Sequence, residues 1–388
     1  MVKVSTRLTV LVLALATSPA GAETAACGKL AAERTIKHDG KDLSVWSYSG
    51  KDGRVATIVA NDMRVNADGA VRAYAAYGQH GLSYLCDGAL VAKQGGSLSK
   101  DDKVVCGEAV AEINKLKVEG NTLRFPATMQ HRVCVVGFAV NDGKAGCLKD
   151  GSGVLIGGGK AASAPVVISL RDATGTEMPH FLSETALRHA TSEPGKPGNS
   201  LDAATLPFVV VPKSASLPVA KGQFAYVASD GTAAPAGATP IARSVPAVVG
   251  DTGPEGLFGE GSIALHQFLA YGNTREAPPF DPRVCPSDAP ACTNTLRRDG
   301  TVFPYPYQDK GGGDVRAKTN WPGPLLHIFL PATGAPRPDR YTISADAAGM
   351  AYGAGTIADG ARAAALPFGG IDEIARCVRA AKIVPGRK

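Results

Sequence analysis

Short apolar runs separated by turn residues recur along most of the chain. Such runs lie at residues 104–106, 122–125, 132–140, 153–156, 165–170, 207–211, 224–228 and 245–249. Turn signals such as Asn-Asp-Gly at 141–143 and Ser-Asp-Gly at 229–231 stand between them. Short apolar runs bounded by such residues are typical of strands. The pattern predicts a mainly β protein with a barrel-like core, for which a double-psi β-barrel is one form, and a few appended helices.

Residues 56–71 give the clearest β pattern near the N-terminus. An apolar run is followed by an alternating segment from Asp62 that ends at Asp68-Gly69. Alternation of this kind indicates a half-buried strand, and Asp-Gly indicates a tight turn. The segment therefore predicts two strands and a turn.

Helical patterns are few. Ser262 is a suitable N-cap for a helix that runs through Leu265 and Leu269 and ends at Gly272. Residues 371–381 form an amphipathic pattern that carries Cys377. A third patch, at residues 27–34, also has a helix-like composition.

The first residues resemble an export signal. Lys3 and Arg7 precede a short apolar run at residues 8–16, and Ala20-Gly21-Ala22 fits a cleavage site. We expect residues 1–22 to be a signal peptide, and the protein to be secreted or periplasmic. The run is too short to span a bilayer, and no later segment is long and apolar enough, so no membrane span is expected.

Composition and cysteines narrow the class further. Lys3 and Arg7 leave with the expected signal peptide, which lowers the formal charge from +6 to +4, and no dense basic block remains. We therefore expect no nucleic-acid partner. We also expect a monomer. An even number of cysteines in an exported chain predicts disulfides, with two short-range pairs as candidates, 134–147 and 285–292. The cysteines and histidines show no zinc-ligand spacing, so neither metal nor cofactor is expected.

The strongest chemical signal lies at residues 247–265. An apolar run ends at Asp251, a Gly- and Pro-rich loop follows, and Glu260 stands between two glycines before the Ser262 helix. Burial at a strand end would raise the pKa of Asp251, whereas the dipole of the following helix would favour ionised Glu260. This makes Asp251 the expected general acid and Glu260 the general base, with the reverse assignment open. The loop permits the separation of about 6.5–9.5 Å that an inverting glycosidase needs.

Other patterns compete with this interpretation. The two acids could simply face water in a surface loop. Asp-Thr-Gly at 251–253 is also the aspartic-protease signature, but that chemistry needs two copies and the chain has one. The Gly-rich stretch at 151–160 lacks the spacing of a phosphate loop, and residues 66–73 lack the glutamate of a calcium loop.

Three segments in order resemble glycoside hydrolase family 75, the fungal-type chitosanases. They are the alternating segment at 62–69, Leu-Asp-Ala through Pro-Phe-Val-Val at 201–210, and Gly-Asp-Thr-Gly with Gly-Glu-Gly-Ser-Ile-Ala-Leu at 250–265. The resemblance covers about residues 55–272 and implies that Asp251 and Glu260 are the catalytic carboxylates. Substrate-binding candidates within these segments are Asp62, Asp68, Asp202 and Thr252.

The resemblance implies a secreted enzyme that hydrolyses β-1,4 bonds within a glucosamine-containing polysaccharide by inversion, with that polysaccharide as its partner. On this division, a lead-in at 23–54 precedes the catalytic domain at 55–272, and a Pro/Gly-rich extension with a terminal helix occupies 273–388. One departure is that Arg64 and Asn66 stand where the family motif is acidic. Because chitosan is a polycation, this departure favours a non-catalytic glycan-binding or cell-envelope protein as one alternative. A second alternative is a peptidoglycan-cleaving barrel enzyme, because double-psi β-barrel glycan enzymes have a similar Asp-Thr-Gly strand end.

Overall fold

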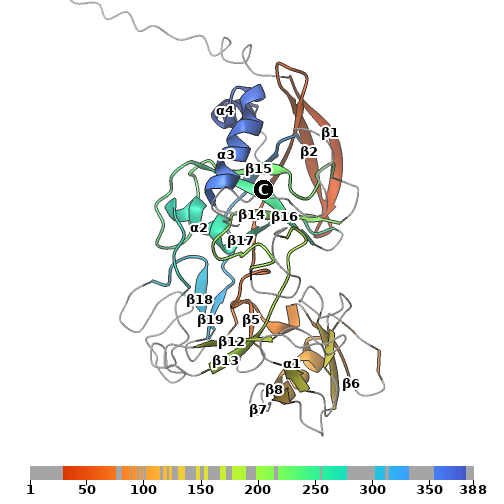
Figure 1. Ribbon diagram of the computed structural model, residues 1–388. Coiled ribbons are helices and arrows are strands. Elements are labelled where there is room, and N and C mark those ends of the chain that lie inside the picture. The colour runs from red at the N-terminus through yellow and green to blue at the C-terminus, as the bar shows by residue number, and fades with distance from the viewer. Residues whose placement is uncertain are drawn as a thin grey trace, which may run out of the picture.

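The structure is a computed structural model (Figure 1). The described residues are 29–75, 81–87, 89–93, 96–97, 99, 102–113, 117–119, 122–124, 130–135, 146–148, 153–155, 167–171, 177–188, 198–213, 217–253, 256–277, 302–310, 314–331 and 354–381. Strands outnumber helices among them, which confirms a mainly β protein with few helices. The expected signal peptide at 1–22 lies outside the described residues.

A mixed nine-stranded sheet is the largest element. In spatial order it contains β1 (Lys29–His38), β2 (Lys41–Ser49), β3 (Val55–Asn61), β20 (Leu325–Phe329), β15 (Phe224–Ser229), β16 (Arg243–Gly253), β14 (Phe208–Pro212), β17 (Glu260–Ser262) and β4 (Arg64–Asn66). The pairs β14–β16 and β17–β4 are parallel, and the other neighbouring pairs are antiparallel. The described ladders form an open series, and no closed barrel is seen in them.

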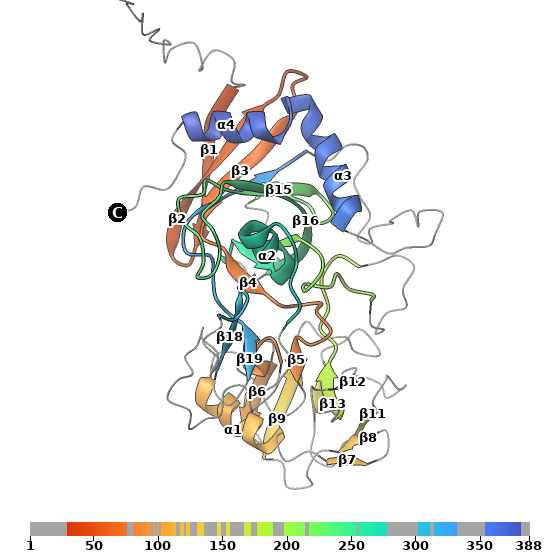
Figure 2. The same cartoon turned by 90° about the vertical axis from the view of Figure 1, so that its left-hand side faces the viewer.

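The last strand of this series, β4, is connected to β3 by a short link in the chain. Only Asp62 and Met63 separate β3 from β4, although five other strands lie between them in the sheet. Figure 2 shows α2 (Ile263–Tyr271) end-on, with β15, β16 and β4 around it. The helix is almost wholly buried, because its side chains face the curved sheet.

Smaller sheets lie in the lower half of Figure 1. One contains β12 (Val167–Arg171), β13 (Glu177–Phe181) and β5 (Tyr74–Ala75); a second contains β10 (Gly146–Leu148), β9 (His131–Val135) and β6 (Ala89–Lys93). A third contains β11 (Gly153–Leu155), β8 (Thr122–Arg124) and β7 (Lys117–Glu119), and β18 (Tyr307–Asp309) pairs with β19 (Val315–Ala317). The predicted strands at 122–125, 132–140, 153–156 and 165–170 are thus confirmed in part of their length.

Two local predictions were wrong. The expected strand at 104–106 is the first turn of helix α1 (Lys103–Ile113). Its buried residues Cys106, Ala109, Val110 and Ile113 recur at helical spacing, which a three-residue window could not reveal. The helix-like patch at 27–34 is strand β1 from residue 29 onward, because this segment pairs along its length with β2.

The lead-in and the C-terminal extension both contribute to the main sheet. β1 and β2 extend it beyond β3, and β20 lies between β3 and β15. All five residues of β20 are buried, as expected for an inner strand. The predicted terminal helix is confirmed as α4 (Ile371–Ala380), and α3 (Ala354–Ala365) precedes it.

Disulfides tie parts of this arrangement together. Cys86 and Cys106 form one bridge, with a Cα–Cα distance of 6.0 Å, and Cys377 of α4 is also disulfide-bonded. Cys134 lies directly opposite Cys147 in the β9–β10 ladder, so that pairing stays a prediction with matching register. The pair 285–292 lies outside the described residues. No helix in the described ranges has the length and apolar character that crossing a membrane requires.

Close packing of α3 on the sheet depends on Gly360. A Cβ atom at this position would lie 2.1 Å from Cζ of Phe224, whose side chain is buried in β15. Gly355, in the same helix, has open space around the corresponding position. The glycine at 360 therefore permits a contact that any side chain would displace.

We expect Gly360→Ala to lower the free energy of unfolding by about 1–3 kcal/mol, because the added methyl group overpacks the contact with Phe224. Gly355→Ala is the matched control and should be neutral or stabilise by up to ~1 kcal/mol, since alanine favours helix. Urea unfolding followed by circular dichroism would measure both. Equal effects of the two substitutions would contradict close packing at Gly360.

Candidate active site

The two acids of the 247–265 segment lie on either side of one strand. Val210 of β14 is paired with Asp251 of β16 on one edge and with Glu260 of β17 on the other. Two strand spacings place the Cα atoms of the two acids roughly 9–10 Å apart. β16 ends at Gly253 and β17 begins at Glu260, two strands away in the sheet, so residues separated along the chain become neighbours across Val210.

Gly250 is an extra residue in β16, directly before Asp251. Val209 is paired with Val249 and Val210 with Asp251, so Gly250 has no counterpart in β14. A Cβ atom on Gly250 would lie 2.7 Å from side-chain atoms of Leu201 and Phe208. A bulge of this kind changes the direction of the following side chain. The close approach of the Leu201 and Phe208 side chains therefore requires glycine at 250.

Asp251 is a buried carboxyl group, 9% exposed. Its Oδ1 atom accepts hydrogen bonds from the backbone N–H groups of Ala186 and Thr252, each at 2.8 Å. The pKa of Asp251 is raised from 3.8 to about 7, mainly by burial, then by the negative charge of Asp68 and, to a smaller extent, that of Glu260. The two N–H groups lower the pKa, but burial outweighs them. Asp251 therefore holds a proton into the neutral range.

Glu260 begins β17, three residues before α2. The preceding Gly259 has φ 95°, and a Cβ there would lie 2.4 Å from the carbonyl oxygen of Asp62, so this tight approach requires glycine. The Glu260 side chain is half-buried, and its Oε2 accepts a hydrogen bond from Nδ2 of Asn66 at 3.3 Å. Glu260 is thus more accessible than Asp251 and has a fixed amide donor.

Ser262 anchors the strand that carries Glu260. Its hydroxyl caps α2 by accepting from the N–H of Leu265 at 3.2 Å, which confirms the predicted N-cap. The same hydroxyl donates to the carbonyl of Leu206 at 2.7 Å and accepts from the N–H of Phe208 at 3.0 Å. Gly272, at φ 81°, ends the helix as predicted. One serine therefore joins β14, β17 and α2.

Asp68 brings a third carboxylate to this group. Its charge is the second largest cause of the raised pKa of Asp251, after burial. Oδ1 of Asp68 accepts from the hydroxyl of Tyr74 at 2.8 Å, and Oδ2 accepts from Nδ2 of Asn66 at 3.2 Å. Gly69 completes the turn at φ 83°, and its N–H donates to Oγ of Ser183 at 2.9 Å. Asp68 thus belongs to the candidate site.

Asp62 and Arg64 interact with residues outside the group formed by Asp68, Asp251 and Glu260. Asp62 is exposed, and its charge acts on the buried ring of His38. Arg64 forms an ion pair with Asp39 at 2.8 Å, with both side chains largely exposed. The alternating segment therefore divides, with Asn66 and Asp68 at the carboxylate group and the earlier residues outside it.

Asp202 and Thr252 have local roles in the structure. The Asp202 carboxylate accepts from the N–H of Ala204 and the hydroxyl of Thr205, both at 3.0 Å, and so closes a turn before β14. Thr252 is half-buried beside Asp251 and donates its N–H to that carboxylate. Neither has a described contact with Glu260, so their binding of substrate stays a prediction.

Several contributors carry no chemical signal in the sequence. Tyr74 comes from β5 of a separate sheet, and burial together with the charge of Asp68 raises its pKa. Ala186 contributes only its N–H, from a segment 65 residues away from Asp251.

His266 lies on the buried side of α2, away from the carboxylates. Its Nε2 donates to the carbonyl of Arg64 at 3.1 Å, and its Nδ1 accepts from the hydroxyl of Tyr305. Burial lowers its pKa to about 4, so the ring is neutral at physiological pH. In the part of the chain that the structure describes, no group of His, Cys, Asp or Glu residues is arranged to hold a metal ion.

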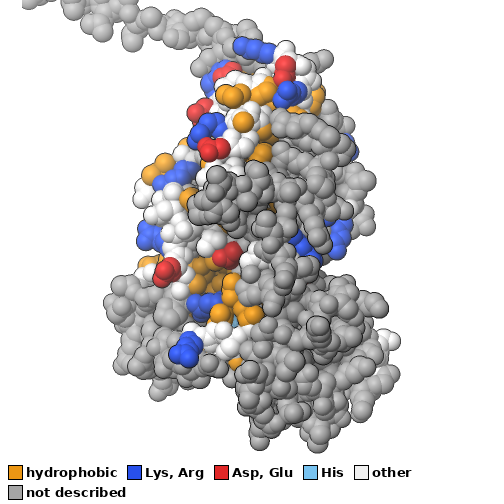
Figure 3. All heavy atoms as spheres, in the orientation of Figure 1, with side chains coloured by type: hydrophobic (Ala, Val, Ile, Leu, Met, Phe, Trp, Pro, Cys, Tyr) orange, Lys and Arg blue, Asp and Glu red, His pale blue; other side chains and the backbone are white. Residues whose placement is uncertain are grey.

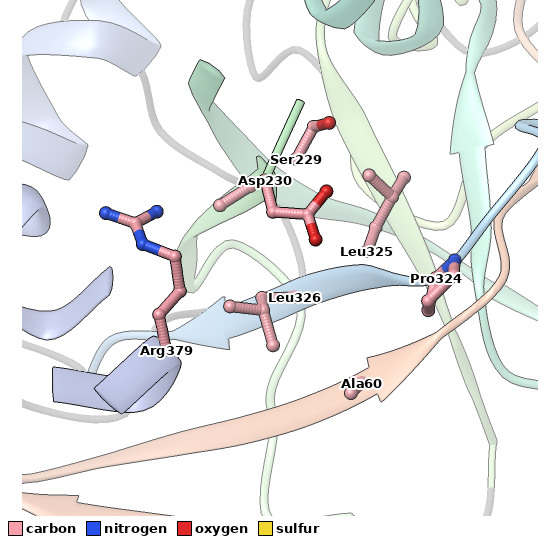
Figure 4. A pocket seen from close by; sticks show the side chains of 8 residues that line it. Ala60, Ser229, Asp230, Pro324, Leu325, Leu326 and Arg379 are labelled. Atoms are coloured by element: carbon pink, nitrogen blue, oxygen red, sulfur yellow. The ribbon is translucent and has the colours of Figure 1, made fainter. Parts of the chain in front are cut away.

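A mainly apolar pocket lies elsewhere, between β3, β15, β20 and the end of α4. Figure 4 shows Asp230 and Arg379 on opposite sides of it, with Leu326 between them. The complete lining is Ala60, Ala228, Ser229, Asp230, Pro324, Leu325, Leu326 and Arg379. No member of the carboxylate group contributes to this pocket.

A scan of the sequence against protein-family models gave no match, and a search of curated proteins found no related sequence. The functional interpretation therefore depends on the residues and their geometry.

The raised pKa of Asp251 predicts a pH-dependent stability. The folded protein holds this proton between about pH 4 and about pH 7, where the unfolded chain has released it, so stability falls as pH rises. Asp251→Asn cannot ionise and keeps an acceptor for both N–H groups. Its free energy of unfolding should therefore rise relative to wild type by up to about 4 kcal/mol from acidic to neutral pH.

Urea unfolding at both pH values measures this difference. Asp230→Asn, at an exposed turn residue, is the control and should show the same small difference at both pH values. A difference for Asp251→Asn that does not change with pH would contradict a proton held on Asp251.

Proposed function

We propose that the protein is a secreted glycoside hydrolase that cleaves β-1,4 bonds within a glucosamine-containing polysaccharide by inversion. The observation that carries the proposal is that Asp251 and Glu260 flank Val210 in unlike environments. One carboxyl group is buried and protonated into the neutral range, and the other is half-buried with an amide donor. Inverting glycosidases divide the acid and base roles between two such groups.

In this mechanism, Asp251 is the general acid. Its proton passes to the glycosidic oxygen as the bond between that oxygen and the anomeric carbon breaks. Glu260 takes a proton from water, whose oxygen forms the new bond to the anomeric carbon from the opposite face. The Cα separation of roughly 9–10 Å across Val210 is compatible with the carboxyl separation of about 6.5–9.5 Å that inversion requires. Both N–H donors to Asp251 bind Oδ1, which leaves Oδ2 as the oxygen for proton transfer.

The fold supports this proposal in two ways. The strand series from β3 to β4 is joined at its ends by the short link at 62–63, as a barrel-like core would require. The three segments that resemble family 75 chitosanases also meet in space: Asp68, the β14 strand and the Asp251–Glu260 pair are all connected by the contacts described above. An exported enzyme is consistent with the disulfide between Cys86 and Cys106.

The charge around the site favours an amino-sugar polymer of moderate positive charge. Asp68 and Glu260 supply negative charge, whereas Arg64 is paired with Asp39 and Asn66 is neutral. Figure 3 shows acidic and basic side chains interspersed over the described atoms of one face. A partly acetylated glucosamine polymer fits this balance better than a fully deacetylated, densely cationic one.

We expect the protein to release reducing ends from partly acetylated chitosan and the first product to have the inverted anomeric configuration. Asp251→Asn and Glu260→Gln should each lower kcat by about 100-fold or more, because each removes a proton-transfer group. Reducing-end assays and NMR of the early product would measure rate and configuration. Asp230→Asn, outside the site, should retain the wild-type rate.

Chitin and peptidoglycan should be tested in parallel. Unchanged hydrolysis in both carboxylate variants would exclude these residues as the catalytic pair. Binding of the polymers without hydrolysis would instead favour a non-catalytic glycan-binding protein, the role suggested by the loss of acids at positions 64 and 66. Cleavage confined to peptidoglycan would identify a different substrate for the same pair.

A further inference from the structure

Asn66 connects two of the three carboxylates. Its Nδ2 atom lies 3.3 Å from Oε2 of Glu260 and 3.2 Å from Oδ2 of Asp68. Its Oδ1 accepts the backbone N–H of Asp68 at 2.9 Å. Both carboxylates need a donor and the N–H needs an acceptor, so the orientation of the amide is determined by its partners.

The Asn66 side chain has little freedom to leave this position. It is 8% exposed and belongs to β4, whose residue 66 is paired with Ser262 of β17. Ser262 in turn joins β14 and α2 through its hydroxyl. The amide therefore occupies a rigid part of the sheet, between a turn carboxylate and a strand carboxylate.

The carboxylates of Glu260 and Asp68 repel each other, and a donor that is shared between them offsets part of this repulsion. Tyr74 donates to the other oxygen of Asp68, so this carboxylate is supported from both sides. Asp68 also acts electrostatically on Asp251, and Asn66 is thus linked to both members of the proposed catalytic pair.

We infer that Asn66 is a positioning residue whose amide holds Glu260 and Asp68 in their ionised forms and fixes the direction of the Glu260 carboxylate. The role in catalysis depends on the proposed function, whereas the carboxylate bridge does not. The departure from an acidic motif at this position therefore has a specific effect, since an aspartate here would place a third carboxylate between two others.

Two substitutions test the bridge without any activity assay. Asn66→Ala removes the donor, and Asn66→Asp replaces it with a group that donates only when protonated. A donor to ionised carboxylates stabilises the fold above their unfolded pKa and loses this effect as they become protonated. We expect each variant to raise the unfolding equilibrium constant at least about 10-fold more near pH 7, where the carboxylates are ionised, than near pH 2, where they are protonated.

Asn320→Asp is the matched control. Asn320 is exposed, and its Oδ1 accepts the N–H of Val65, the neighbour of Asn66, a role that a carboxylate retains. This variant should show nearly the same small deficit at both pH values. A deficit of the Asn66 variants that does not change with pH would show a packing role only and would overturn the inference.

An exchange variant provides a rescue. Asn66→Asp combined with Glu260→Gln places the amide on the other side of the same contact, so its neutral-pH deficit should be at least about 10-fold smaller than that of Asn66→Asp alone. A double variant as unstable as the sum of its parts would contradict direct contact between the two side chains.

Activity provides a separate measurement. If the protein hydrolyses the polymer, Asn66→Ala should lower kcat about 10-fold with KM changed less than about 3-fold, and the acid limb of its pH profile should move to higher pH. A changed KM with unchanged kcat and pH profile would overturn the catalytic part. If the stability deficits of the Asn66 variants depend on pH but the protein hydrolyses none of the polymers, the bridge is supported and the proposed function is rejected.

Discussion

The pairing of β14 on both of its edges is the constraint on which the candidate site depends. All five residues of this strand are buried, so its backbone groups must be paired by neighbouring strands. β16 pairs with one edge in parallel, and β17 pairs with the other in the antiparallel direction. Because the same chain segment supplies both partners, its two acids are brought to the same residue, Val210. Ser262 strengthens this arrangement by linking β14 to α2.

Burial is the dominant electrostatic effect at Asp251. Two N–H groups stabilise its ionised form, yet its pKa is raised to about 7 because desolvation is larger and Asp68 adds like charge. Those N–H groups belong to Ala186, after β13, and to Thr252. The small sheet of β12, β13 and β5 therefore contributes the Tyr74 hydroxyl on Asp68, and the segment that follows β13 contributes the N–H of Ala186. It supports the electrostatics of the main sheet without containing either proposed catalytic residue.

Much of the local structure was predictable. The strands at 207–211, 224–228 and 245–249 are parts of β14, β15 and β16 because continuous apolar runs suit inner strands. The apolar pattern did not predict β20, although its residues are as buried as those of β14, because the proline and glycine around it are typical of a loop. α1 was mistaken for a strand because its apolar spacing becomes helical only over 106–113. The helix-like patch at 27–34 is a strand from residue 29 onward because pairing with β2 outweighs local propensity.

The sequence by itself determined the features that arise between near neighbours. Glycine at 69 permits its turn, serine at 262 caps its helix, and acids at 251 and 260 mark a chemical segment. Only the tertiary structure decided which groups meet these acids. The Ala186 N–H comes from 65 residues away and the Asn66 amide from 194 residues away. Such contacts depend on strand order and register, which are set by the packing of the whole sheet and leave no periodic signal in any short stretch of the chain.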